Sequence, residues 1–197
     1  MRRMILAALA ALAFAGAGCS RGDDAQPEPT VRSSTVVAPE TRVDAVPHEE
    51  PAVARQQWRA VGDSARAITG NLRVSIEERR GGPLIFAFAT GVTIRAQLYS
   101  VVPAETRSGV GGQSFAALLG GDPRVDVYLY RVLNENVTTS APRGGLCEGM
   151  RTRIMAVSEF VDASGRWVFK VAAFRGEGAP GSGDDTILCN AYAYTTQ

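Results

Sequence analysis

The side chains best suited to catalysis or metal binding are few in this sequence. It contains a single histidine, a single lysine and three cysteines: His48, Lys170, Cys19, Cys147 and Cys189. Ser114 lies in Gly112-Gln113-Ser114-Phe115-Ala116, which is similar to the Gly-x-Ser-x-Gly turn of serine hydrolases, but that chemistry needs a later histidine as base. A Ser–Lys dyad would need Lys170, which no motif supports. We therefore expect Ser114 to cap a short helix.

The acidic pairs are weak candidates for catalysis or metal binding. Glu77 and Glu78 are adjacent, so on a strand their side chains point to opposite faces. Asp184 and Asp185 lie in a glycine-rich segment, where a solvated turn is favoured over a calcium site. His48 is expected in a solvated linker, and the expected domain has neither a histidine nor a second cysteine pair for zinc. We expect no catalytic residues, metal or cofactor.

Tyrosines alternate on two expected strands, as Tyr128 and Tyr130 and as Tyr192 and Tyr194. Alternate residues of a strand share a face, so each pair points to one side of the sheet. The four rings could form an exposed stripe that binds a sugar or a protein. The plainer interpretation, which we favour, is packing between strands with the hydroxyl groups at the edge.

The elements that must position these residues begin after an export signal. Two arginines precede an apolar run at 4–17, which is too short to cross a bilayer as a helix. The run ends in Ala17-Gly18-Cys19, which resembles the lipobox of bacterial lipoproteins, although Gly16 stands where leucine is usual. The resemblance implies cleavage after a signal peptide at 1–18 and acylation of Cys19, with palmitate among the expected chains. Ordinary cleavage after Ala15 or Ala17 would instead release a secreted protein.

Cysteine parity agrees with a lipid anchor. Exported proteins rarely leave a thiol unpaired, so one lipid-bearing cysteine and one disulfide between Cys147 and Cys189 would account for all three. By resemblance to Gram-negative lipoproteins, Ser20 permits sorting to the outer membrane. We therefore expect the protein to be held by its lipid at the outer membrane, facing the periplasm.

The segment 19–54 is expected to be a disordered tether. It is rich in proline and acidic residues and has no aromatic residue, so it buries too little apolar surface to offset its ordering entropy. The remaining segment, 55–197, has the length of one domain. The formal net charge of +1 argues against nucleic-acid binding, which normally needs a basic patch.

The domain is expected to be all-β, an antiparallel sandwich or small barrel of about seven to eight short strands with one or two short helical turns. Helical turns are predicted from Trp58 through Ala65 and at 113–119. Asp162-Ala163-Ser164-Gly165 predicts a hairpin turn. Period-2 alternation and turn residues predict strands at 68–76, 84–88, 92–101, 125–132, 153–160, 166–174 and 186–195.

This layout resembles the membrane-bound inhibitors of C-type lysozyme, which are small envelope lipoproteins with one β-barrel. The shared features are the lipobox, the tether, a tryptophan at the start of the domain and a late cysteine; their Ser-Gly-x-Arg-Tyr loop is absent, and Thr90-Gly91-Val92-Thr93-Ile94-Arg95 matches it poorly. We expect a non-enzymatic envelope lipoprotein that binds a protein, glycan or lipid. The alternative is a carboxylate-dependent periplasmic hydrolase, which requires two acids converging in a pocket, at least one with a raised pKa.

Overall fold

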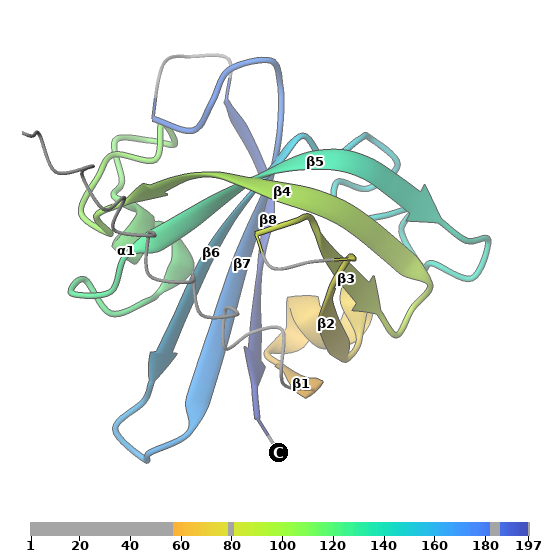
Figure 1. Cartoon of the computed structure of the whole chain (residues 1–197), viewed down its shortest axis with the longest axis horizontal. Coiled ribbons are helices and arrows are strands. Elements are labelled where there is room, and N and C mark those ends of the chain that lie inside the picture. Colours follow the sequence, from red (N-terminus) through yellow and green to blue (C-terminus); the bar gives the residue numbers. More distant parts are fainter. Residues whose placement is uncertain (1–56, 79–80, 182–185, 197) are drawn as a thin grey trace, which may run out of the picture. The chain divides into compact units, whose positions relative to one another are not determined.

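The computed structural model describes residues 57–78, 81–181 and 186–196. In these residues eight antiparallel strands form a closed barrel, in which each strand pairs with the next along the chain and β8 closes on β1 (Figure 1). This confirms the all-β class and decides for a barrel over a sandwich. The strands are β1 (Gln57–Val61), β2 (Leu72–Ile76), β3 (Leu84–Phe88), β4 (Val92–Val102), β5 (Val127–Val137), β6 (Ile154–Val161), β7 (Trp167–Arg175) and β8 (Ile187–Thr195).

The start of the barrel differs from the sequence prediction. Trp58 lies on strand β1 and not on a helix, because β2 and β8 offer a pairing edge on each side of it. The strand expected at 68–76 begins only at Leu72, and the residues before it form a π-helical turn, η2 (Ala65–Thr69). Gly70 ends this turn with a φ of 64°, a left-handed conformation that glycine adopts at little cost.

The other elements follow the predicted pattern closely. β3 has the expected bounds, and the expected helical turn is α1 (Phe115–Leu119), whose N-cap Ser114 accepts a hydrogen bond from the Ala117 amide at 3.2 Å. β5 is longer than expected and continues to Val137, because β4 offers partners as far as Val92. The predicted strand ended at 132, before the polar residues that begin at Asn134, and the long ladder with β4 overrides this local polarity.

Two apolar clusters stabilise the domain. The first fills the barrel interior with aromatic and aliphatic side chains, among them Trp58 and Phe169, whose ring centroids are 5.0 Å apart. The second lies on the outer faces of β5–β8, where Phe115 and Leu119 of α1 cover Leu129 and Ala172. The inside of the barrel is therefore core, and part of its outside is covered as well. No helix of the described residues is long and apolar enough to cross a bilayer.

Candidate functional site

The tyrosines predicted as a possible exposed stripe lie mainly inside the barrel. Tyr130, Tyr192 and Tyr194 are exposed by 2%, 2% and 0%, and half-buried Tyr128 packs against the same core. The Tyr194 hydroxyl is 2.7 Å from the Thr69 hydroxyl. Burial raises the pKa of the Tyr130 and Tyr194 hydroxyls well above the ordinary value. The exposed stripe is therefore wrong for these three. The structure has packing between strands, but the Tyr192 and Tyr194 hydroxyls are buried in the interior and not at the edge.

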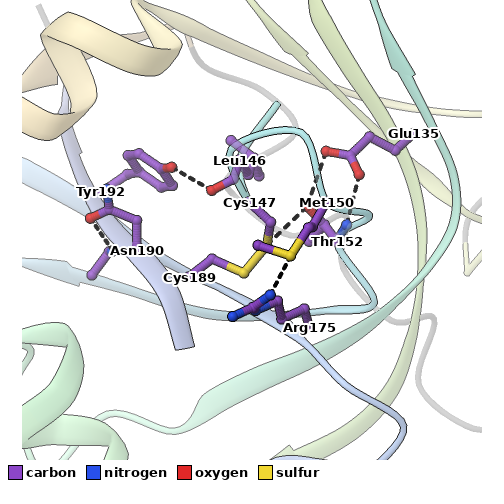
Figure 2. The surroundings of a disulfide bond; sticks show 10 residues. Glu135, Leu146, Cys147, Met150, Thr152, Arg175, Cys189, Asn190 and Tyr192 are labelled. Atoms are coloured by element: carbon purple, nitrogen blue, oxygen red, sulfur yellow. Dashed lines mark hydrogen bonds between the residues drawn. A yellow bond between two sulfur atoms is a disulfide. The ribbon is translucent and has the colours of Figure 1, made fainter. Parts of the chain in front are cut away.

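A loop closes one end of the barrel and is held there by the disulfide. Cys147 and Cys189 are bonded, with their Cα atoms 5.0 Å apart, which confirms the predicted pair. Leu146 and Cys147 are buried in the interior cluster, and the Tyr192 hydroxyl donates a hydrogen bond to the Leu146 carbonyl oxygen (Figure 2). We call residues 138–153 the plug loop. The interior cluster and this loop occupy much of the space in which many barrels hold a ligand.

Glu135 fixes the plug loop from the opposite wall. One of its carboxylate oxygens accepts a hydrogen bond from the Thr152 amide at 2.7 Å, and the other accepts one from the Thr152 hydroxyl at 3.0 Å (Figure 2). This half-buried carboxylate therefore has a structural role at the end of β5. A pocket of about 350 Å³ lies beside it, lined by Asn134, Val137, Gly144, Gly149, Met150 and Arg151.

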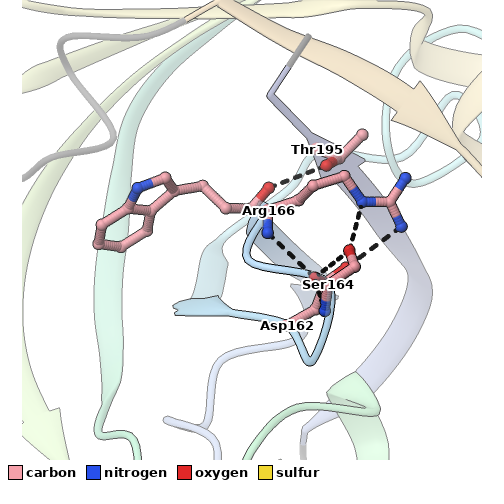
Figure 3. A network of polar contacts seen from close by, with 5 residues as sticks. Asp162, Ser164, Arg166 and Thr195 are labelled. Carbon is pink, nitrogen blue, oxygen red and sulfur yellow. Dashed lines mark hydrogen bonds and ion pairs between the residues drawn. The ribbon is translucent and has the colours of Figure 1, made fainter.

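The hairpin between β6 and β7 is rigidly built. One carboxylate oxygen of Asp162 accepts hydrogen bonds from the Ser164 amide, the Ser164 hydroxyl and the Arg166 amide, and the other oxygen pairs with the Arg166 guanidinium at 3.2 Å (Figure 3). These bonds, that of the Ser164 hydroxyl foremost, lower the pKa of the Asp162 carboxyl to about 2. The Trp167 carbonyl oxygen also accepts a hydrogen bond from the Thr195 hydroxyl. The hairpin is thus tied to itself and to β8.

This hairpin carries two apolar side chains next to its turn. Val161 and Trp167 are paired across the two strands and are 48% and 38% exposed. Val161 lies on the same face of β6 as Met155 and Val157, which are core residues farther along the strand. The hairpin therefore continues an interior apolar face to a place where the described residues leave it partly exposed.

A second candidate lies on the outer face, where Lys170 is paired in register with Ser158 of β6 and with Ala193 of β8. The Ser158 hydroxyl is buried and has no hydrogen-bond partner. A Ser–Lys dyad needs an accessible hydroxyl bonded to the amine, and Ser158 meets neither condition. Ser158 was missed from the sequence, although the hairpin turn at 162–165 carries the signal that sets this register.

The other residues considered in the sequence are dispersed. Glu77, directly after β2, forms an ion pair with Arg95 of β4, whereas Glu78 is exposed in a left-handed conformation with a φ of 61°. Asp184, Asp185, His48 and Cys19 lie outside the described residues, as do the signal segment and the tether. Within the described part of the chain, no three histidine, cysteine or acidic side chains are grouped to hold a metal ion.

Comparisons with known proteins identify no family for this chain. The chain matches no known protein family, no curated protein and no solved structure.

Proposed function

We propose that this protein is an envelope lipoprotein, held at the outer membrane by lipid on Cys19, whose barrel is a non-enzymatic module that binds a protein, glycan or lipid. The anchor is supported by the lipobox-like segment and by cysteine parity, since the two other cysteines pair with each other. The apolar side chains and the plug loop that occupy the interior support binding at the exposed rim of the barrel.

The observation that carries the binding proposal is the exposed pair Val161 and Trp167 on the rigid β6–β7 hairpin. Tryptophan is enriched among the residues that dominate binding energy, because it buries a large area and loses few rotatable bonds. The hydrogen bonds of Asp162 order the turn in the unbound protein. Binding a partner therefore does not have to pay the entropy cost of ordering this turn. The flat indole face suits a protein surface, a sugar ring or an acyl chain.

The carboxylate-dependent hydrolase has less support. It needs two acids across a cleft, one of them with a raised pKa. In the described part of the chain the carboxyl groups with a resolved pKa shift are Asp122 and Asp162, and the pKa of each is lowered to about 2 by hydrogen bonds, chiefly from Arg124 and Ser164 respectively. With lowered pKa values, both carboxyl groups are ionised near neutral pH, whereas the hydrolase needs one with a raised pKa.

The binding proposal is tested on the full-length lipidated chain. Envelope extracts are cross-linked to the wild type, to Trp167→Ala and to Leu133→Ala, a matched control because Leu133 is 39% exposed on another strand. Candidate glycans and vesicles are assayed with the same three proteins. We expect Trp167→Ala to weaken binding of the recovered ligand by about tenfold or more and Leu133→Ala to leave it unchanged. Equal binding by all three proteins would refute the role of the hairpin.

The anchor has a separate test. Mass spectrometry of the mature protein is expected to find an acylated N-terminal Cys19, and Cys19→Ala is expected to lose membrane association. An unacylated mature N-terminus in the wild type would refute the anchor without touching the binding proposal.

A further inference from the structure

A small pocket on the outside of the barrel is lined in part by Lys170. Its walls come from the turn between β1 and η2, from Leu119 of α1 and from Ala191 and Ala193 of β8, and its volume is about 150 Å³. The C-terminal end of α1 lies close to Lys170. A Cβ atom placed on Gly120, the C-cap of this helix, would be 3.9 Å from the Lys170 Nζ. The pocket is therefore formed by elements far apart in sequence.

Lys170 has no direct partner for its charge among the described residues, although Asp63 lines the same pocket. Among the described residues it makes no ion pair or hydrogen bond, whereas other basic side chains on the surface, such as Arg143 and Arg153, pair with carboxylates. Burial lowers the pKa of the Lys170 amine, because desolvation disfavours the charged form. A half-buried cation beside apolar walls is unfavourable unless an anion or hydrogen-bond acceptor joins it. Among the described residues, no acceptor group of the pocket is therefore in hydrogen-bond contact with Lys170.

Two features of the pocket limit the size and the charge of a ligand that it could bind. The volume is below that of pockets for drug-sized molecules, so only a small ligand or a small terminal group fits. Asp63 also lines the pocket, and its negative charge opposes a dianion more strongly than a monoanion. Tyr192 is the other ionisable residue of the wall, and its hydroxyl is bonded to Leu146 in the barrel interior.

We propose that this pocket binds the carboxylate group of a small organic acid, with the Lys170 ammonium as its charged donor and Leu119, Ala191 and Ala193 as the apolar walls around its carbon chain. Ammonium–carboxylate hydrogen bonds are among the stronger ones in proteins. This site is independent of the β6–β7 hairpin tip, and its failure would leave the proposed function standing.

The test uses the fact that Lys170 is the only lysine of the chain. Lysine labelled with ¹³C and ¹⁵N gives one Cε–Nζ signal from the full-length protein, without chemical modification. We expect propionate to shift this signal saturably and to raise the pKa of Lys170, because a bound carboxylate favours the charged amine. Phosphate at the same ionic strength is expected to bind about tenfold more weakly at pH 8, because it has no carbon chain to contact the apolar walls and, as a dianion, is repelled more strongly by Asp63.

Two variants test whether binding depends on the charges of Lys170 and Asp63, while amide spectra show that the fold is intact. Lys170→Met keeps a similar length without the charge and is expected to lose binding by about tenfold or more, read from the backbone amide signals of Ala191 and Ala193. Asp63→Asn is expected to reduce the preference for propionate over phosphate. Absence of a propionate-dependent shift in the wild type, or equal binding by Lys170→Met with intact amide spectra, would overturn the proposal.

Discussion

The Tyr192 hydroxyl lies 2.9 Å from the Leu146 carbonyl oxygen and donates a hydrogen bond to it, which joins the last strand to the plug loop inside the barrel. The disulfide joins the same two segments nearby, between Cys147 and Cys189. The plug loop therefore has one covalent and one hydrogen-bonded attachment to β8. Substitutions can remove the hydrogen bond and the disulfide separately.

Tyr192→Phe is expected to lower the free energy of unfolding by about 1–3 kcal/mol, because the buried Leu146 carbonyl loses its donor while the aromatic packing remains. Denaturant titration of the full-length protein measures the change. Tyr99→Phe is the control, since Tyr99 is exposed on β4, and it is expected to be close to neutral. An unchanged free energy of unfolding in Tyr192→Phe would show that this hydrogen bond contributes little to stability.

Replacing both cysteines in Cys147→Ala/Cys189→Ala is expected to lower the free energy of unfolding by about 4 kcal/mol. The bond spans 42 residues, and the loss follows from the greater entropy of the unfolded chain without the crosslink. Denaturant midpoints of the variant and of the wild type, with and without reductant, measure it. Reductant is expected to destabilise the wild type and leave the variant unchanged; a wild type unaffected by complete reduction would contradict the prediction.

Asp162 is expected to contribute to stability in a pH-dependent way. Its carboxyl has a pKa of about 2 in the folded protein against an ordinary 3.8, so the folded state favours the ionised form. The resulting stabilisation is complete above the ordinary pKa and is lost as the pH falls through about 2. Asp162→Asn should therefore be less stable than the wild type at pH 7, with a difference that shrinks between about pH 4 and pH 2.

Thermal unfolding at a series of pH values measures this difference, and carboxyl NMR of the wild type reports the pKa directly. Asp126→Asn serves as the control, because Asp126 is exposed on the chain before β5. A carboxyl pKa near 3.8 for Asp162 would contradict the prediction.

Two buried hydroxyl groups are expected to behave in opposite ways. Thr69 donates to the Ala65 carbonyl at 2.9 Å and contacts the Tyr194 hydroxyl, so Thr69→Val should destabilise the domain by about 1–3 kcal/mol. The Ser158 hydroxyl has no partner, so Ser158→Ala should be neutral or stabilising, because a buried unsatisfied group is removed. Denaturant titrations of the two variants make the comparison, and a larger loss for Ser158→Ala would contradict it.

The sequence alone determined much of the secondary structure of the barrel. Alternation predicted β3 with its bounds and four further strands to within about one residue at each end, and Ser114 was expected as a helix cap. These features depend on local chemistry, namely period-2 patterning, turn residues and capping side chains. Counting cysteines also predicted the bond between Cys147 and Cys189.

Tertiary structure decided what the strands bury and which residues meet. Alternation places Tyr128 and Tyr130 on one face, but only closure of β8 on β1 makes that face an interior. Trp58 became a strand residue because two neighbouring edges were available to it, and local sequence carries no record of those edges. Lys170 acquired a pocket because α1 and the β1–η2 turn, distant in sequence, lie beside β7 and β8. Such contacts arise from long-range packing, which periodicity along one strand cannot encode.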